Sequence, residues 1–272
     1  MSKYTVVNND FVLAGEASVL ITDLAVQRGY GIFDFFKIIN GQPIFLEDHL
    51  DRFYHSAGQL RLPVAYNRDE LKAVLFELMK KNGVSDSGIR ITLTGGYSPD
   101  GYTVVKPNMI ITQQPLTISK EINTQGIKVI THPHQRQMAH IKTIDYLMAI
   151  WLQPLIKEKG ADDVLYHNNG MVKEVPRANF FIVTPNNEVL TSGTGVLKGI
   201  IRKQLLGLNG NGFNVQEREI SLEEVMACKE AFITSSTKNI LPVTEIDGHV
   251  IGNGGAGEVS KALSEKLTSL FN

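Results

Sequence analysis

The chain has 272 residues, of which 43% are hydrophobic and 20% charged, and its net charge is −1. This composition is typical of a globular protein with a sizeable core, and the near-zero charge argues against binding to nucleic acid or to anionic membranes. Cys228 is the only cysteine, which excludes an internal disulfide and the cysteine-rich zinc motifs. The N-terminal residues lack the pattern of a signal peptide, and no apolar run is long enough to span a membrane. We therefore expect a cytoplasmic protein.

The first part of the chain alternates short strands with two helices. Strands are predicted over 4–7, 11–13, 35–39 and 44–46, with Asn40-Gly41 as the hairpin turn between the last two. Helices are predicted over about 46–60 and 68–82, the second ended by Gly83. Strands at 89–94 and 108–113 flank a loop, 95–101, that is rich in turn-forming residues. We expect this loop to be exposed and available for substrate contact.

Residues 115–126 are polar and unpatterned, so they are predicted to link an N-terminal domain, 1–114, to a C-terminal domain, 127–272. In the second domain we expect strands at 127–131, 164–166, 180–183 and 231–234, a hairpin at 243–251, and helices near 144–159, 200–208, 222–227 and 257–271. Strands and helices alternate in both halves. This order favours two α/β or α+β domains.

Lys142 and Glu174 are the first candidates for chemistry. Lys142 stands between isoleucines, at Ile141 and Ile144. Most lysines are solvated surface charges, but burial lowers the pKa of an amine and makes it nucleophilic toward an aldehyde. A carboxylate such as Glu174, between two strands, is usually an exposed turn residue. When buried, however, it can keep the ring nitrogen of a pyridoxal cofactor protonated.

Two stretches suit a phosphate group. Gly199 precedes a predicted helix, whose first N–H groups and dipole favour anions. The run Thr234-Ser235-Ser236-Thr237 ends a predicted strand with four hydroxyl groups. Each stretch also fits a simple helix cap or turn.

The order and spacing of Arg52, Lys142, Glu174, the Gly199 turn and Ser235-Ser236 resemble those of the class IV aminotransferases. The resemblance extends from about Asp23 to the C-terminal helix. It implies a two-domain fold type IV enzyme with α/β and α+β character, in which pyridoxal 5′-phosphate lies between the domains. It also implies a homodimer with a shared active site.

The resemblance implies roles for the residues around the cofactor ring. Lys142 is the Schiff-base lysine and moves the proton between Cα and C4′. Glu174 bonds the pyridine nitrogen, Leu197 packs against one face of the ring, and Tyr146 bonds the phenolate oxygen.

The phosphate is expected to be held by Arg52, the N–H groups of Ile200 and Ile201, and the hydroxyls of Ser235 and Ser236. Ile201 replaces a threonine that is usual in the family. One phosphate-binding hydroxyl is therefore missing, and only the backbone N–H remains.

The substrate side departs from the family pattern. D-amino-acid transaminases hold the α-carboxylate with a tyrosine, an arginine and a histidine, and these positions are Phe33, Asp100 and Tyr102 here. Branched-chain aminotransferases also have a tyrosine at the first of these positions. The usual carboxylate-binding set is therefore absent.

Three cations at unusual positions could replace that set: Arg28, Arg177, and Lys238 beside Thr237. A buried carboxylate requires such donors, and Arg28 is expected to act across the dimer interface. The alternative is that all three are solvated surface charges.

The predicted reaction is the exchange of an amino group between an amino acid and a 2-oxo acid, with D-amino acids favoured. A branched-chain L-amino-acid aminotransferase and an aminodeoxychorismate lyase are the alternatives on the same fold. A non-catalytic binding protein is the alternative of a different class, and retention of Lys142, Glu174 and Arg52 argues against it. No metal site is predicted, because the His132-Pro133-His134 stretch has no evident carboxylate or cysteine partner.

Overall fold

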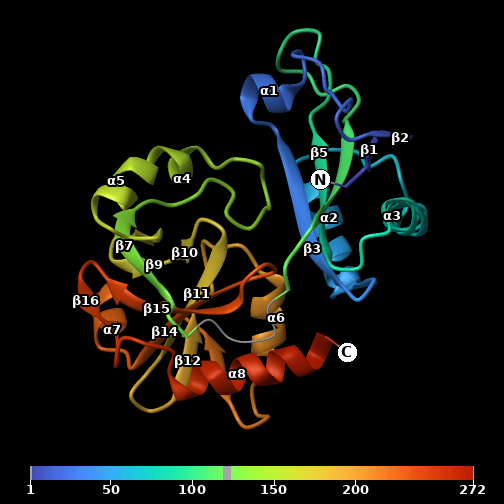
Figure 1. Ribbon diagram of the computed structural model, residues 1–272. Coiled ribbons are helices and arrows are strands. Elements are labelled where there is room, and N and C mark those ends of the chain that lie inside the picture. The colour runs from blue at the N-terminus through green and yellow to red at the C-terminus, as the bar shows by residue number, and fades with distance from the viewer. Residues whose placement is uncertain (1, 119–123, 272) are drawn as a thin grey trace. The chain divides into compact units, whose positions relative to one another are not determined.

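The computed structural model describes residues 2–118 and 124–271, so residues 119–123 of the predicted linker lie outside it. The chain divides into two compact units (Figure 1). Unit 1 comprises Met1–Ile118 and Ile141–Asp145, and unit 2 comprises Ser119–His140 and Tyr146–Asn272. The expected C-terminal domain included Lys142, whereas the segment that carries this lysine packs within unit 1.

Unit 1 is built on a six-stranded antiparallel sheet in the order β2-β1-β6-β5-β3-β4. Its strands are β1 (Tyr4–Val7), β2 (Asp10–Leu13), β3 (Gly31–Ile39), β4 (Gln42–Pro43), β5 (Ser87–Thr94) and β6 (Met109–Pro115). Asn40 and Gly41 join β3 to β4 with φ angles of 51° and 76°. This is the hairpin turn that the sequence predicts, because an Asn-Gly pair tolerates two successive positive φ angles.

The helices of unit 1 are α1 (Leu24–Arg28), α2 (Leu46–Gln59) and α3 (Arg68–Asn82). Helix α3 agrees with its prediction because both ends carry strong signals: an Asn67–Glu70 capping box at the start and Gly83 at φ 63° at the end. The prediction of a strand over 44–46 is wrong, since α2 already begins at Leu46. Helix α1 was not predicted.

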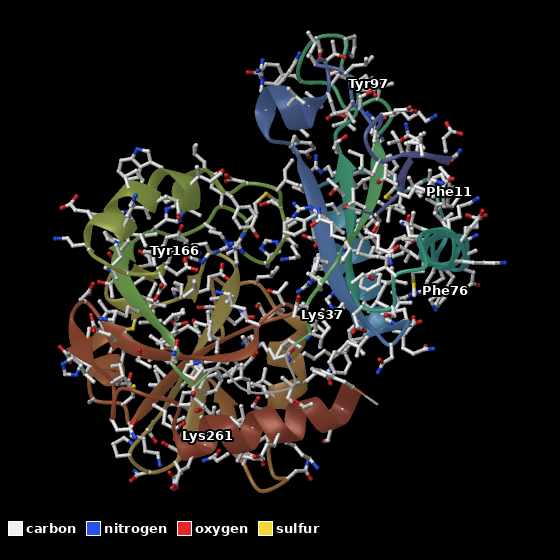
Figure 2. The ribbon with its side chains drawn as sticks, in the orientation of Figure 1. Phe11, Lys37, Phe76, Tyr97, Tyr166 and Lys261 are labelled. Atoms are coloured by element: carbon white, nitrogen blue, oxygen red, sulfur yellow. The ribbon has the colours of Figure 1, made fainter. Side chains whose placement is uncertain are left out.

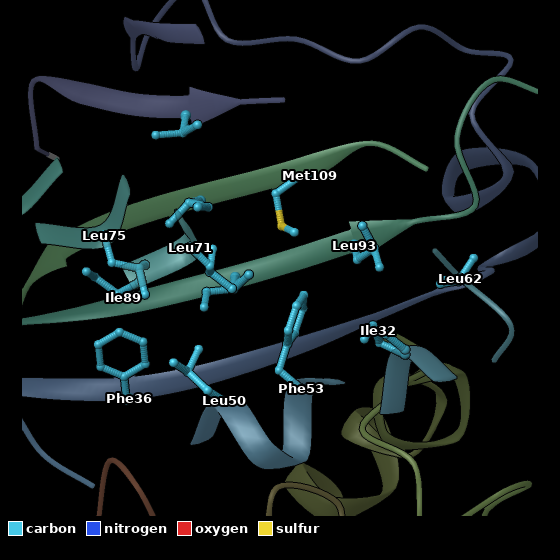
Figure 3. Packing of buried hydrophobic residues seen from close by; sticks show 14 of the residues in the cluster. Ile32, Phe36, Leu50, Phe53, Leu62, Leu71, Leu75, Ile89, Leu93 and Met109 are labelled. Carbon is cyan, nitrogen blue, oxygen red and sulfur yellow. The ribbon is translucent and has the colours of Figure 1, made fainter. Parts of the chain in front are cut away.

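The core of unit 1 lies between the sheet and helices α2 and α3 (Figure 3). Ile32, Phe36 and Ile38 alternate along β3 on the face toward this core. The buried partners from the two helices are Leu50, Phe53, Ala57, Leu71, Leu75 and Leu78. Alternation along the strand therefore places Phe33, Phe35 and Lys37 on the opposite face of the sheet.

Unit 2 contains a ten-stranded mixed sheet. Its strands are β7 (Ile127–Pro133), β8 (Asp163–Asn168), β9 (Met171–Val172), β10 (Glu174–Val175), β11 (Ala178–Val183), β12 (Glu188–Thr191), β13 (Asn214–Glu217), β14 (Glu230–Ser235), β15 (Asn239–Ile246) and β16 (His249–Val250). Strand β7 runs parallel to β8 and β15, and β12 runs parallel to β13, while the other pairs are antiparallel. The predicted hairpin at 243–251 corresponds to β15 and β16.

The helices of unit 2 are α4 (Leu147–Trp151), α5 (Gln153–Glu158), α6 (Ile200–Leu206), α7 (Leu222–Met226) and α8 (Glu258–Thr268), followed by the 3-10 turn Ser269–Phe271. The prediction of one helix over 144–159 is wrong, because the helix is interrupted at Leu152. Pro154 stands in the first turn of α5, and a proline lacks the N–H that a continuous helix requires.

Apolar side chains cover both faces of the unit 2 sheet. One cluster includes Phe180, Ile182 and Ile233 from the central strands. A smaller cluster packs helix α5 on β7 and β8 through Ile156, Val164 and Tyr166 (Figure 2). Within the described ranges, no helix has the length and apolar character needed to cross a membrane.

Candidate active site

Lys142 is positioned by backbone hydrogen bonds to strand β3 of unit 1. The Phe33 N–H donates to the Lys142 carbonyl at 2.9 Å, and the Ile144 N–H donates to the Gly31 carbonyl at 3.1 Å. A Cβ atom at Gly31 would lie 2.9 Å from the Leu93 carbonyl oxygen and 3.1 Å from Ile144 Cδ1, so the close approach of these segments requires glycine. Ile141 is fully buried in the core. The lysine thus lies in a segment without regular secondary structure that is hydrogen-bonded to β3, and the residue is half-buried.

Two cations contact the ring of Phe33. The Lys142 Nζ lies 4.4 Å from the ring centroid, and the Arg90 guanidinium carbon lies 3.7 Å from it. Arg90 reaches Phe33 from the neighbouring strand β5, where Thr92 is in register with Phe33 and Arg90 with Phe35. Both distances are within the range of cation–π attraction. Arg90 was not predicted as a site residue, since its position next to Phe33 depends on strand register.

Arg52 belongs to a buried cluster with Asp34 and His49. Its guanidinium donates through Nε to Asp34 Oδ2 and through Nη2 to Asp34 Oδ1, both at 2.8 Å. His49 Nδ1 lies 2.7 Å from Asp34 Oδ1. Burial raises the pKa of Asp34, but the Arg52 and His49 interactions outweigh it and leave that pKa well below the usual range. Neither Asp34 nor His49 was among the predicted site residues.

Glu174 of unit 2 is the first residue of β10 and is only 4% exposed. Its Oε2 accepts a hydrogen bond from the Leu197 N–H at 2.9 Å, and its Oε1 accepts one from Arg136 Nε at 2.7 Å. Two predicted site residues, Glu174 and Leu197, are therefore adjacent. Arg136 was missed, because it is separated from Glu174 by 38 positions in the sequence.

Asn179 on β11 brings the predicted phosphate-binding segments together in unit 2. Its Nδ2 donates to the Leu197 carbonyl at 2.7 Å, and a Cβ atom at Gly199 would come within 2.1 Å of its Oδ1. Asn179 is also in register with Thr234 at the end of β14. The start of α6 and the hydroxyl-rich end of β14 thus lie on either side of one asparagine.

The polar groups in this part of unit 2 fit a phosphate ester. Helix α6 begins at Ile200, and the first N–H groups of a helix have no acceptor within the helix. The Thr234 hydroxyl oxygen is buried and has no hydrogen-bond partner among the residues that the structure describes. Ser235 and Ser236 are half-buried beside it, and Ser235 Oγ accepts from the Lys238 N–H at 3.2 Å.

Tyr146 is the residue before helix α4 and belongs to unit 2. It is half-buried, and its carbonyl accepts a hydrogen bond from the Ile150 N–H at 3.0 Å. Its predicted bond to the cofactor remains a prediction.

Arg177 and Lys238, which were predicted to bind substrate, both act on one buried carboxylate. Arg177 Nη2 lies 3.7 Å from Asp163 Oδ2, and the guanidinium side chain is 67% exposed. The pKa of Asp163 is raised by its burial, and the charges of Arg177 and Lys238 oppose this shift. Thr237 is exposed beside Lys238, and its Oγ1 lies 3.2 Å from Ser235 Oγ.

Arg28 and Asp100 belong to unit 1. The Arg28 guanidinium carbon lies 5.2 Å from the centroid of the Tyr102 ring. Asp100 accepts hydrogen bonds from the Tyr102 N–H at 2.9 Å and from the Thr103 N–H at 2.7 Å, and these bonds hold the pKa of its carboxyl group well below the usual range. Asp100 therefore shapes its own loop.

Comparisons with known proteins identify the family. The model of the family described as amino-transferase class IV matches residues 31–246. A D-alanine aminotransferase of Bacillus licheniformis is 29% identical over 267 residues, which cover 96% of this chain and 94% of that protein. A putative branched-chain-amino-acid aminotransferase of Methanocaldococcus jannaschii is 30% identical over 276 residues, with 97% and 94% covered.

Solved structures agree on the fold. The branched-chain amino acid aminotransferase of Escherichia coli has a TM-score of 0.91 at 23% identity and covers 100% of this chain and 95% of its own. The branched-chain aminotransferase of Thermoproteus uzoniensis, solved with norvaline, has a TM-score of 0.86 at 26% identity, with 98% and 94% covered. The predicted fold class and cofactor are confirmed: this chain belongs to the class IV aminotransferases, which are pyridoxal-phosphate-dependent enzymes of fold type IV.

Proposed function

We propose that this enzyme exchanges an amino group between an amino acid and a 2-oxo acid, with a preference for D-amino acids. Pyridoxal phosphate, when bound, supplies the electron-withdrawing ring that acidifies the Cα–H bond of the substrate. Lys142 provides the Schiff-base amine and moves the proton to and from the reacting carbon. The backbone hydrogen bonds that tie its segment to β3, and its half-buried position beside Phe33, support this role.

Glu174 accepts the hydrogen bond of the cofactor's ring nitrogen, and Leu197 packs against the ring. Their adjacency in unit 2, through a 2.9 Å hydrogen bond, supports both assignments. The phosphate is held by the N–H groups of Ile200 and Ile201 and by Ser235 and Ser236. In support, Asn179 contacts Leu197 and Gly199, just before the first pair, and is in register with Thr234, just before the second. Arg52 supplies the positive charge, and Tyr146 bonds the phenolate oxygen.

The substrate carboxylate is held by Arg90, and the observation that carries this assignment is the stack of Arg90 on Phe33. The arginine is exposed, and its guanidinium lies over the same ring that Lys142 Nζ contacts. A guanidinium can bind a carboxylate through two parallel N–H donors. Arg177 and Lys238 are less favoured as carboxylate-binding residues, because both already interact electrostatically with the buried carboxylate of Asp163.

The proposal of a homodimer is supported by an exposed apolar surface on unit 1. The Leu24 N–H donates to the Gly96 carbonyl at 3.0 Å, and the Arg28 guanidinium carbon lies 5.2 Å from the Tyr102 ring centroid, so the segment 20–28 and the loop 95–105 are neighbours. Their exposed side chains are Leu20 at 59%, Ile21 at 82%, Val26 at 59%, Tyr102 at 80% and Val105 at 62%. Clusters of this kind mark interaction sites. Sedimentation equilibrium tests the proposal, and a monomer at micromolar concentration would contradict it.

The preference for D-amino acids is supported by the full-length likeness to the D-alanine aminotransferase of Bacillus licheniformis. The likeness to the putative branched-chain-amino-acid aminotransferase of Methanocaldococcus jannaschii supports the L-specific alternative. The test follows the absorbance of the bound cofactor in single half-reactions with D-alanine, D-glutamate, L-leucine and L-glutamate. We expect faster conversion with the D-amino acids, and faster conversion with L-leucine would establish the alternative.

A further inference from the structure

Arg136 contacts the carboxylate of Glu174 inside unit 2. It lies three residues after strand β7, and its Nε donates to Glu174 Oε1 at 2.7 Å. The arginine side chain is 16% exposed and the glutamate side chain 5%. A contact between charges so well shielded from water is stronger than a surface ion pair.

Arg136 is itself held in place. Its Nη2 donates to the carbonyl of Ala139, three residues further along the same loop, at 2.7 Å. The guanidinium therefore bridges the Ala139 carbonyl and the Glu174 carboxylate. Because the guanidinium is planar, these two hydrogen bonds fix its orientation. A lysine at this position would retain the charge but lose the geometry.

The bond from Arg136 and the bond from the Leu197 N–H fall on different oxygens of Glu174. A carboxylate offers about four acceptor positions, which is more than these two donors occupy. Burial alone would favour the neutral acid, whereas an adjacent guanidinium favours the carboxylate. A carboxylate accepts a hydrogen bond from an N–H group, and its weakened basicity leaves the shared proton on the nitrogen.

We propose that Arg136 is a positioning residue that keeps Glu174 ionised and oriented, so that the ring nitrogen of the cofactor stays protonated. This inference rests on the proposed role of Glu174. Arg136 acts through the glutamate and is not proposed to contact the cofactor. The position of the proton, rather than activity alone, is therefore the property to measure.

The experiment uses full-length enzyme reconstituted with pyridoxal phosphate that carries ¹⁵N in its ring, because the nitrogen chemical shift reports protonation. Four proteins are compared with the wild type: Arg136→Gln, Arg136→Lys, Glu174→Gln and the control Arg218→Gln. Arg218 is an exposed arginine of the same unit that pairs with Glu224 at 2.7 Å. Thermal unfolding of each protein shows whether it is folded.

In the Arg136→Gln variant we expect the nitrogen signal to move toward the unprotonated value and kcat to fall by about ten- to a hundredfold, with KM little changed. The nitrogen signal and kcat of Arg136→Lys should lie between those of Arg136→Gln and the wild type, because lysine restores the charge but not the planar guanidinium. The Arg218→Gln control should match the wild type. These results would support the role of Arg136.

A wild-type nitrogen signal in both Arg136 variants, together with a lost proton in Glu174→Gln, would overturn this inference alone. A wild-type signal in Glu174→Gln would overturn the proposed role of Glu174, and the role of Arg136 with it. If Arg136→Gln does not fold, the Arg136→Lys variant decides: an unchanged nitrogen signal and an unchanged pH profile of kcat would refute the proposal.

Discussion

Asp34 holds Arg52 through two parallel hydrogen bonds, from Nε to Oδ2 and from Nη2 to Oδ1, each 2.8 Å long. Asp34 on β3 thus fixes the plane of the Arg52 guanidinium, which extends from α2. The Asp34 side chain is 1% exposed and that of Arg52 is 10% exposed. Arg52 would therefore bind an anion while already paired with Asp34. The stability of unit 1 depends on the same ion pair.

We expect Asp34→Asn to lower the free energy of unfolding by about 3–5 kcal/mol, because it leaves a buried guanidinium without its counter-charge. The matched control is Asp51→Asn, which removes an acid that pairs with Arg68 on the surface at 2.5 Å. That change should cost less than about 1 kcal/mol. Urea unfolding of the three proteins measures both values, and equal losses in the two variants would contradict the prediction.

His49 should make stability depend on pH. Burial lowers its pKa, and this effect outweighs the opposing charge of Asp34. Below a pH of about 6.5 the unfolded chain takes up a proton at this histidine, whereas the folded protein keeps it neutral, so stability falls as pH falls.

The His49→Asn variant should lose this dependence of stability on pH, while the side-chain amide of the asparagine can still donate a hydrogen bond to Asp34. The stability difference between wild type and variant should therefore shrink as pH falls from about 7 to 5, by up to about 1.4 kcal/mol per pH unit. Denaturant unfolding in that interval measures it, and Asp34 stays ionised there because its pKa is lowered. A difference independent of pH would show that His49 is not kept neutral by the fold.

The sequence predicts the longer elements of the fold well, because their signals are local. Helix α3 carries an Asn67–Glu70 capping box at its start and Gly83 at its end. The strand β12 and the two-residue strands β9 and β10 were missed, since such short runs have too few residues for a period. The break between α4 and α5 depends on one proline in an otherwise helical pattern.

Residue type and spacing single out candidates such as Lys142 and Glu174 because these match a family pattern, and their roles remain predictions. Arg136 and Asn179 are visible only in the structure, since each acts through a partner distant in the sequence. The pairing of Arg90 with Phe33 likewise depends on the register of β3 with β5. A single amino-acid sequence does not show which distant residues form such pairs.

Borohydride reduction should attach the pyridoxyl group to Lys142 and not to Lys37. Lys37 lies on β3 (Figure 2) and is 4% exposed, and burial lowers its pKa to about 8. It therefore provides an internal control for simple amine reactivity. Peptide mapping by mass spectrometry locates the label. Lys142→Ala should keep cofactor binding through the phosphate contacts and lose turnover by several orders of magnitude, and a label on Lys37 in the wild type would refute the assignment.

Arg52→Ala should weaken cofactor binding by about 1.5–3 kcal/mol, the usual contribution of a hydrogen bond to a charged group. Fluorescence titration of the apoenzyme with pyridoxal phosphate measures the change, at a temperature well below unfolding because the substitution also removes the partner of Asp34. Glu174→Gln is the comparison, since it should retain affinity and lose much of kcat. Unchanged affinity in Arg52→Ala would show that the phosphate is held without this arginine.

Arg90→Met should raise the KM for amino acids by about ten- to a hundredfold, which corresponds to the loss of a charge-assisted hydrogen bond to the carboxylate. Methionine can still cover the Phe33 ring, and Arg90 is exposed, so stability and cofactor absorbance should change little. The control is Lys81→Met, which removes a cation 5.2 Å from the Phe11 ring in the same unit and should leave KM unchanged.

Arg28→Ala, Arg177→Ala and Lys238→Ala, tested in the same half-reactions, separate the other candidates. An increase in KM confined to Arg177→Ala and Lys238→Ala would place the carboxylate in unit 2, next to Asp163, and Arg90 would then be a surface cation. An increase in Arg28→Ala that disappears when the enzyme is diluted to monomers would instead show that this arginine acts from a second copy. If these three variants and Arg90→Met all keep the KM of the wild type, none of the four cations holds the carboxylate, and the proposed cationic site is wrong.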